Sequence, residues 1–348
     1  MLKTDIKSMN LDELTEYIKS IGQPAFRAKQ LYEWMHVKLA DSYDEMSNIP
    51  AALKQRLQNE CDMPVHELVR KQVSAEDKTA KYLFRLEDGN LIESVLMHYH
   101  HGNSVCISSQ VGCRMGCRFC ASTLDGLERN LRPSEMLDQI YRIQKDSGER
   151  VSNVVVMGSG EPFDNFDNLI KFEQLLTDEN GLNISARNLT VSTCGIVPNI
   201  YRLADMKLQL TLAISLHAPN DERRKALMPI ANKYSIAEIM EACRYYINKT
   251  GRRVTFEYSL VKGENDECAA ELSELVKGMN CHINLIPVNP IKERNFKQSD
   301  IDRINKFKNK LEKNRINVTI RREMGRDIDG ACGQLRKSYM EIHPKEQL

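Results

Sequence analysis

The chain has 348 residues, a formal net charge of +1 and ten cysteines. This length accommodates one large domain or two to three small ones, and the charge means that a polyanion would have to bind a local basic patch. No apolar run is long enough to span a bilayer, and the first residues lack the apolar core of a signal peptide. We therefore expect a cytoplasmic protein without membrane contact, whose cysteines serve metal ligation or thiol chemistry rather than a disulfide framework.

Residues 1–62 are predicted to form a helical accessory domain, a candidate for RNA binding. Leu11, Leu14 and Ile18 recur at helical spacing, and Gly22 marks a break between helices. A linker with a β-hairpin is predicted for residues 63–100. In that linker a central Asp-Gly pair separates two runs of alternating polarity, KYLFRLE and NLIESVLMHY.

Residues 101–335 are predicted to form a parallel β/α core, followed by a tail at 336–348. Short β-branched runs alternate with helical segments, and right-handed helical crossovers join parallel strands. The predicted strands are VCISS (105–109), NVVVM (153–157), LTVST (189–193), LTLAISL (210–216), VTFEYSL (254–260) and INLIPV (283–288). Periodicity alone allows an open doubly wound sheet or a barrel, complete or partial.

Chemically distinctive residues follow these strands. Three cysteines follow the first and GSGEP (158–162) follows the second, while polar residues end the third, fourth and sixth. Functional loops of parallel β/α proteins lie at the carboxyl ends of their strands. The sequence therefore predicts one functional rim.

Cys113, Cys117 and Cys120 have the spacing C-x3-C-x2-C. Three thiolates can hold three corners of a cuboidal iron–sulfur cluster and leave one iron open, since full protein ligation normally takes four cysteines. The alternative is a zinc site completed by nearby histidines such as His98, His100 or His101, which would make the chain a zinc-stabilised RNA-binding module. The position of the cysteine triplet at the predicted functional rim favours an iron–sulfur cluster over zinc.

The triplet at the end of the first core strand resembles the radical S-adenosylmethionine (SAM) superfamily. That resemblance implies a partial (β/α)6 TIM-like barrel, one [4Fe–4S] cluster on the three cysteines, and reductive cleavage of SAM to a 5′-deoxyadenosyl radical. GSGEP resembles the superfamily's glycine-rich motif. The residues thereby implied to bind SAM are Gly160, Glu161, Ser192, Ser215, Leu216, His217 and Asn289.

CISSQVGC, AST after the triplet, GEPFDN, SLHAPND and DIDGACGQL together resemble the RlmN/Cfr group of RNA adenine methyltransferases, over residues 93–335. The resemblance implies a two-thiol mechanism that uses two SAM per methyl. Cys332 becomes S-methylcysteine and is joined to the adenine, and Cys106 then forms a transient disulfide with it. Taken alone, Cys106 can equally be a buried strand residue.

Glu93 is the candidate base for the ring proton. It alternates onto the same strand face as Leu91, Val95 and Met97, so we expect a carboxylate on an apolar face, with a raised pKa. The family's corresponding glutamate supports this role. Cys106 is the alternative proton acceptor.

The residues after the triplet resemble the C2-directed members of the group. The predicted activity is methylation of C2 of adenine 2503 in 23S rRNA, with C2 of adenine 37 in some tRNAs as a second target. The alternatives are a C8-directed resistance enzyme and a radical SAM activase that does not transfer methyl groups. The resemblance further implies a monomer reduced by a flavodoxin-like one-electron donor. Basic residues near the rim motifs are candidate phosphate contacts. They are Arg114, Arg118, Arg129 and Arg132 around the triplet, Arg223, Arg224 and Lys225 after SLHAPND, and Arg321, Arg322 and Arg326 before Cys332.

Overall fold

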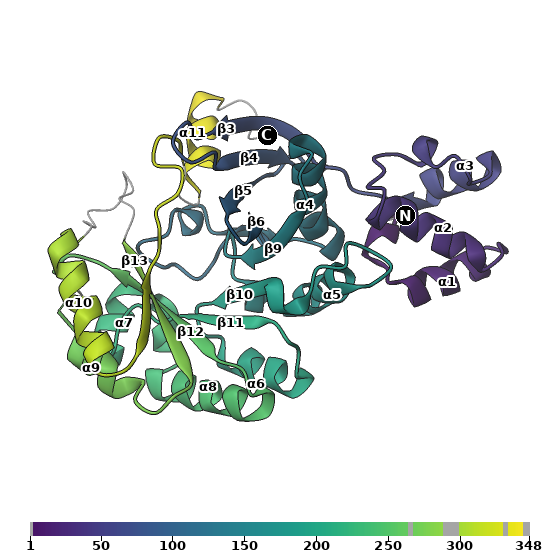
Figure 1. Cartoon of the computed structure of the whole chain (residues 1–348). Coiled ribbons are helices and arrows are strands. Elements are labelled where there is room, and N and C mark those ends of the chain that lie inside the picture. Colours follow the sequence, from purple (N-terminus) through teal and green to yellow (C-terminus); the bar gives the residue numbers. More distant parts are fainter. Residues whose placement is uncertain (1–2, 264–266, 288–298, 330–332, 344–348) are drawn as a thin grey trace.

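The computed structural model describes residues 3–263, 267–287, 299–329 and 333–343. The N-terminal part contains β1 (Thr4–Asp5), η1 (Ile6–Ser8), α1 (Leu11–Ser20), α2 (Phe26–His36), α3 (Ala51–Glu60) and β2 (Cys61–Asp62). A capping box between Asn10 and Glu13 starts α1, and its buried face carries Leu14 and Ile18. The predicted helical region is therefore present, and its three helices gather at one end of the molecule (Figure 1).

A ten-stranded sheet forms the centre of the structure, in the order β14-β13-β12-β11-β10-β9-β6-β5-β4-β3. Its strands are β3 (Glu67–Val73), β4 (Ala80–Arg85), β5 (Leu91–Tyr99), β6 (Gly102–Ile107), β9 (Val151–Val156), β10 (Leu189–Thr193), β11 (Thr211–Ser215), β12 (Val254–Leu260), β13 (Cys281–Pro287) and β14 (Asn317–Ile320). The seven strands from β6 to β14 in this order pair in parallel, whereas β5, β4 and β3 extend the sheet antiparallel. In the described ranges the sheet is not closed, which makes it a partial barrel.

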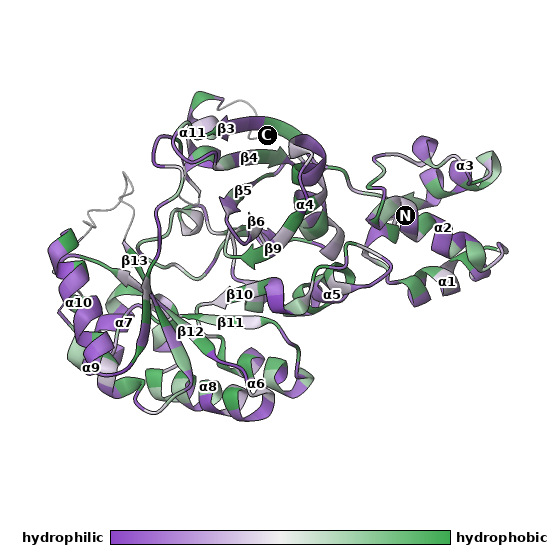
Figure 2. Cartoon of the chain, viewed as in Figure 1, coloured by the Kyte–Doolittle hydropathy of each residue, from purple (hydrophilic) through white to green (hydrophobic). Residues whose placement is uncertain are grey.

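Helices connect the parallel strands and cover the sheet (Figure 1). They are α4 (Pro133–Ser147), α5 (Phe166–Thr177), α6 (Val197–Met206), α7 (Asp221–Leu227), α8 (Ile236–Thr250), α9 (Ala269–Leu275) and α10 (Ile301–Lys313). Figure 2 shows strands rich in hydrophobic residues between helices of mixed hydropathy. Buried strand residues such as Val105, Val154 and Leu212 belong to the main core. In the described part of the chain, no helix has the length and apolar character needed to cross a membrane.

All six predicted core strands are confirmed, as β6 and β9 to β13, and the predicted hairpin is β4 and β5. The sequence pattern did not reveal β14, a seventh parallel strand of four residues that pairs with β13. Nor did it reveal the short antiparallel pair β7 (Gln110–Gly112) and β8 (Leu127–Asn130), which flanks the cysteine triplet. Elements this short give little periodicity to detect.

A buried ion pair joins the N-terminal part to the core. Lys7 Nζ donates to Asp138 Oδ1 over 2.6 Å and to the Pro64 carbonyl over 2.8 Å. The His66 backbone N–H donates to Asp138 Oδ2 over 2.6 Å. The Lys7 and Asp138 side chains are 1% and 0% exposed, so this contact between η1 and α4 is screened from water.

Candidate functional site

The cysteine triplet follows β7 and ends in a short helical turn. The Cys113 backbone N–H donates to the Gly126 carbonyl over 2.7 Å, and the Cys120 N–H donates to the Cys117 carbonyl over 3.1 Å. Cys113 and Cys117 are buried, whereas Cys120 is partly exposed. Burial raises the pKa of the Cys113 thiol to about 12 and also raises that of Cys117. Buried thiols of this kind become thiolate ligands when a metal displaces the proton.

The three thiols line a single cavity of about 200 Å³ at the carboxyl ends of the strands. The cavity is also lined by residues of the glycine-rich loop and the ends of β10, β11 and β12, including Gly160, Glu161, Ser192, Ser215 and His217. Within the described ranges, no three His, Cys, Asp or Glu side chains are arranged to hold one metal ion. Ligands of a cuboidal cluster each bind a different iron. Three cysteines around one cavity that opens onto polar groups fit such a cluster.

The glycine-rich loop after β9 packs tightly against the end of β6. A Cβ on Gly158 would lie 2.7 Å from the Ile107 carbonyl oxygen, and one on Gly160 would lie 2.7 Å from the Gln110 nitrogen. Gly160 also has a φ of +108°, which favours glycine. Gly158 and Gly160 therefore permit this loop to pack closely against residues 107–110, and both glycines also line the cavity.

Glu161 is buried and lines this cavity. Its Oε2 accepts a hydrogen bond from the Cys194 N–H over 2.7 Å, and its Oε1 accepts one from the Phe163 N–H over 2.9 Å. Burial raises the pKa of this carboxyl, although these backbone donors act in the opposite direction. A carboxylate oxygen has two lone pairs, so Glu161 retains capacity to accept from a ligand ammonium.

A carboxylate that the sequence pattern did not single out joins two of the predicted SAM residues. Glu257, on β12, is 5% exposed and lines the cavity. Its Oε2 accepts from Ser192 Oγ over 2.5 Å and from Ser215 Oγ over 3.4 Å. A lone glutamate inside the apolar run VTFEYSL was the signal that could have revealed it.

His217 follows β11 with a φ of +56° and is 4% exposed. The Ser259 N–H donates to its Nδ1 over 2.9 Å, and the Phe119 ring packs edge-on against the imidazole at 4.7 Å. Burial lowers the pKa of His217 to about 3, so the ring is neutral at physiological pH. The preceding residue, Leu216, is fully buried, and its N–H donates to the Glu257 carbonyl.

Glu93 is buried on the hairpin, and its carboxylate holds the start of α11 (Gln334–Ile342). Oε2 accepts from the Gly333 N–H and Oε1 from the Arg336 N–H, each over 2.6 Å. Lys81 Nζ lies 3.2 Å from Oε2 and donates to the Asp329 carbonyl over 2.6 Å. The hairpin thus binds the chain on both sides of residues 330–332.

Gly333 also lies against the cysteine loop. A Cβ at this position would lie 2.9 Å from the Cβ of Ala121, the residue that follows Cys120. Gly333 is the residue that follows Cys332 in the sequence. Cys332 itself and the predicted SAM residue Asn289 lie outside the described residues.

Cys106 is 6% exposed on β6 and is not part of the cavity lining. In the sheet register it pairs with Val95, and Val95 lies two residues from Glu93 on β5. Because side chains two residues apart share a strand face, Cys106 and Glu93 lie on the same face of the sheet. Its neighbours Val105 and Ile107 belong to the core on the opposite face.

The candidate arginines near the rim differ in their partners. Arg129 pairs with Asp88 and Glu135, and Arg132 pairs with Asp62. Arg114 is 63% exposed at its side chain and pairs with Asp164. A phosphate that bound one of these arginines would have to compete with its carboxylate partner.

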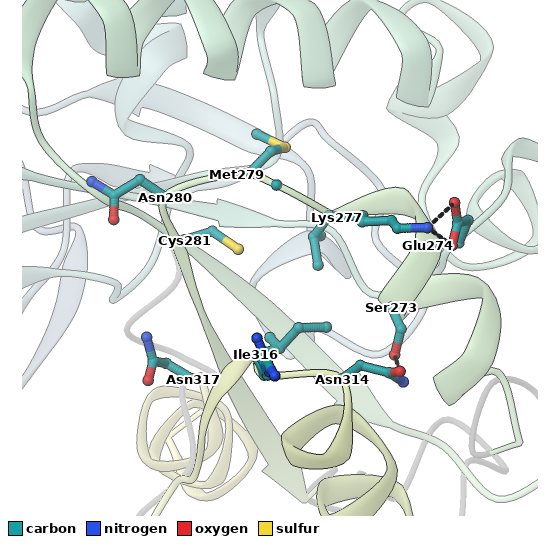
Figure 3. A pocket seen from close by; sticks show the side chains of 12 residues that line it. Ser273, Glu274, Lys277, Met279, Asn280, Cys281, Asn314, Ile316 and Asn317 are labelled. Carbon is teal, nitrogen blue, oxygen red and sulfur yellow. Dashed lines mark hydrogen bonds and ion pairs between the residues drawn. The ribbon is translucent and has the colours of Figure 1, made fainter.

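A second pocket, of about 470 Å³, lies at the opposite ends of β13 and β14. Figure 3 shows its polar lining, where Lys277 pairs with Glu274 at 3.2 Å and Asn314 donates to Ser273 over 3.0 Å. It contains none of the predicted site residues. The predicted residues that the structure describes gather at the other end of the sheet.

Replacing Gly333 with alanine is expected to loosen the start of α11. The change combines a φ of +80° with the 2.9 Å approach to Ala121, a strain of about 1–3 kcal/mol. Amide hydrogen exchange of residues 334–342 should therefore become faster. Gly278→Ala is the matched control, because Gly278 has a φ of +75° with nothing within 4 Å of a Cβ. Equal protection of α11 in both variants would contradict the close contact.

Comparisons with known proteins identify related families along most of the chain. Residues 107–276 match the family model of the radical SAM superfamily, and residues 4–63 match that of the ribosomal RNA large subunit methyltransferase N-terminal domain. A probable dual-specificity RNA methyltransferase RlmN from Lachnospira eligens is 73% identical over 340 residues, 97% of each chain. One from Lachnoclostridium phytofermentans is 61% identical over 341 residues, 97% of this chain and 96% of the relative.

A solved structure supports the same assignment. The crystal structure of a radical SAM methyltransferase from Sphaerobacter thermophilus matches with a TM-score of 0.91 and 42% sequence identity, covering 95% of this chain and 98% of that one. The motifs, the partial barrel and the relatives agree along nearly the whole chain. The chain therefore belongs to the RlmN family of radical SAM methyltransferases.

Proposed function

We propose that this protein methylates C2 of adenine 2503 in 23S rRNA, and C2 of adenine 37 in some tRNAs, with SAM as the methyl source. Its relatives are named as dual-specificity RNA methyltransferases. The observation that carries the proposal for this chain is the position of Gly333. Its N–H binds the Glu93 carboxylate, and a Cβ built on it would lie 2.9 Å from the Cβ of Ala121, so the residue that follows Cys332 in the sequence contacts both the proposed base and the cysteine loop.

The cavity residues fit the cofactors that the family uses. Cys113, Cys117 and Cys120 would hold one [4Fe–4S] cluster, and the cavity walls would hold SAM. When bound, the cluster and SAM supply a hydrogen-abstracting radical. The buried hydroxyls of Ser192 and Ser215, already oriented by Glu257, are suited to bind the polar groups of SAM. The imidazole of His217 is neutral, so it adds no positive charge beside the positively charged SAM.

Two thiols take part in the proposed methyl transfer: Cys332 carries the methyl group, and Cys106 releases the product. Cys332, as a thiolate, takes a methyl from one SAM, and the methyl carbon then loses a hydrogen atom and bonds to C2 of the adenine. The adduct passes its unpaired electron to a one-electron acceptor, the oxidised form of the flavodoxin-like carrier, and gives its C2 proton to a base. The Cys106 thiolate attacks the Cys332 sulfur, so that an S–S bond forms and the C–S bond to the RNA breaks. The electron pair of that bond stays with the carbon, which takes up a proton to complete the methyl group.

Glu93 is the proposed acceptor of the ring proton. Its carboxylate accepts two backbone N–H groups at the start of α11 and lies beside the Lys81 ammonium. Among the described residues, Oε1 accepts only the Arg336 N–H, and a carboxylate oxygen has two lone pairs, so Oε1 retains the capacity to take up a proton. The enzyme is further proposed to act in the cytoplasm as a monomer, reduced by a flavodoxin-like one-electron donor.

The test is mass spectrometry of nucleosides from unmodified 23S rRNA transcript and tRNA, incubated anaerobically with the reconstituted protein, SAM and dithionite. The expected product is 2-methyladenosine. Cys117→Ala should abolish it, whereas Cys243→Ala, which removes a fully buried thiol of the core on α8, should retain it. Formation of 8-methyladenosine would reassign the target atom. Absence of methylated adenosine from a cluster-loaded protein that cleaves SAM would contradict the proposed function.

A further inference from the structure

Arg224, on α7, is a fully buried guanidinium without a carboxylate partner. The side chain is 0% exposed. Nη2 donates to the Cys194 carbonyl over 2.6 Å and to the Ser215 carbonyl over 3.3 Å, and Nε donates to the Leu216 carbonyl over 3.2 Å. Nη1 is buried with no hydrogen-bond partner. Among the described residues, no carboxylate lies within ion-pair distance of this group.

A buried charge in this state is costly, because carbonyl dipoles replace only part of its hydration. An arginine stays protonated at physiological pH, so the chain cannot avoid the cost by neutralising the group. Packing alone would be served better by an apolar side chain. The arrangement therefore points to a negative charge that is supplied from outside the protein chain.

The cysteine loop rests on the same helix. Cys117, Cys194, Leu227 and Met228 form one buried apolar cluster, and the Arg118 N–H donates to the Leu227 carbonyl over 2.9 Å. Cys194 and Ser215 line the cavity, and their backbone carbonyls accept hydrogen bonds from Arg224. Arg224 is not part of that lining and so lies behind the cavity wall. Apolar surroundings screen its charge poorly.

We propose that Arg224 is the fixed counter-charge of the cluster and raises its reduction potential. The inference rests on the proposed ligation by the cysteine triplet. A cluster held by three thiolates has a negative net charge, which grows by one unit when it accepts an electron from a low-potential one-electron donor. No bond forms or breaks in this step. A nearby fixed cation stabilises the reduced form more than the oxidised form.

The test is a redox titration of the reconstituted protein with dithionite and mediator dyes, followed by the electron paramagnetic resonance of the reduced cluster. At the wild-type midpoint, Arg224→Met should lower the ratio of reduced to oxidised cluster about tenfold, which corresponds to about 59 mV for one electron. Arg224→Lys keeps the charge but not the hydrogen bonds, and it should stay close to wild type. Arg223→Met removes an exposed charge one residue away and should change little, because solvent and salt screen it.

Two outcomes would overturn the inference. The first is an unchanged reduction potential in Arg224→Met. The second is an equal shift of the potential in Arg224→Met and Arg224→Lys, because it would mean that the hydrogen bonds of Arg224 set the potential and its charge does not. If Arg224→Met does not fold, Arg224→Gln serves in its place, because it keeps one donor group and removes the charge. Iron and sulfide analysis separates the two proposals. A wild-type protein without a cluster would refute the ligand assignment, whereas a loaded variant with an unchanged potential would refute only the role of Arg224.

Discussion

Replacement of Cys106 by alanine is expected to leave the protein covalently joined to its RNA. In the proposed mechanism, only attack by the Cys106 thiolate on the Cys332 sulfur breaks the bond between protein and methylated base. Without that thiol the reaction stops after the carbon has bonded to the adenine, and multiple-turnover methylation falls by about 10³-fold or more. Denaturing electrophoresis of labelled RNA after anaerobic reaction would show the adduct as a slowly migrating band.

Two controls make this experiment specific. Cys243→Ala removes a fully buried thiol of the core on α8, away from the cavity, and should turn over without trapping RNA. The double variant Cys106→Ala, Cys332→Ala should form no adduct, because the proposed attachment point is gone. Normal release of methylated RNA by Cys106→Ala would exclude the two-thiol mechanism.

Replacement of Lys7 by methionine is expected to lower the free energy of unfolding by about 3–5 kcal/mol. The change leaves the Asp138 carboxylate buried at 0% exposure without its 2.6 Å ammonium partner, and removal of one partner of a buried pair typically costs this much. The N-terminal part should unfold first, since Lys7 ties it to α4. The fluorescence of Trp34, the chain's single tryptophan, reports on this part, and circular dichroism follows the whole protein during the same urea titration.

Lys3→Met is the matched control, because Lys3 is exposed and its bond within the described residues is to the Gln58 carbonyl, over 2.7 Å. Surface substitutions of this kind usually change stability by less than about 0.5 kcal/mol. If Lys7→Met and Lys3→Met unfold at the same urea concentration, the ion pair does not hold the N-terminal part in place.

The sequence revealed the fold through repetition. Six runs rich in β-branched residues, each followed by a helical pattern, identify parallel strands, and carboxyl ends of parallel strands meet at one edge. The cysteine triplet, GSGEP, Ser192 and Ser215 could therefore be placed at one rim from the sequence pattern, and the cavity brings them together. The hairpin was equally clear, because Asp88 and Gly89 satisfy a specific turn.

Contacts between distant parts of the chain were not predictable in this way. The hydrogen bond between Glu93 and Gly333 joins residues 240 positions apart, and nothing local to either residue specifies it. The prediction that Arg224 contacts phosphate was wrong, because Arg224 is fully buried, whereas its neighbour Arg223 in the run ERRK is exposed. Glu257 gave a local signal, a charge in an apolar strand, but its partners Ser192 and Ser215 come from two other strands.

The most direct test of methyl transfer through Cys332 uses SAM with a trideuterated methyl group and follows the mass of the methyl group in the product nucleoside. If the methyl carbon passes through Cys332 and loses a hydrogen atom before it bonds to adenine, the 2-methyladenosine carries two deuterium atoms in its methyl group. The third deuterium should appear in 5′-deoxyadenosine. A product that retains all three deuterium atoms would mean direct polar transfer from SAM, and it would contradict the two-thiol mechanism.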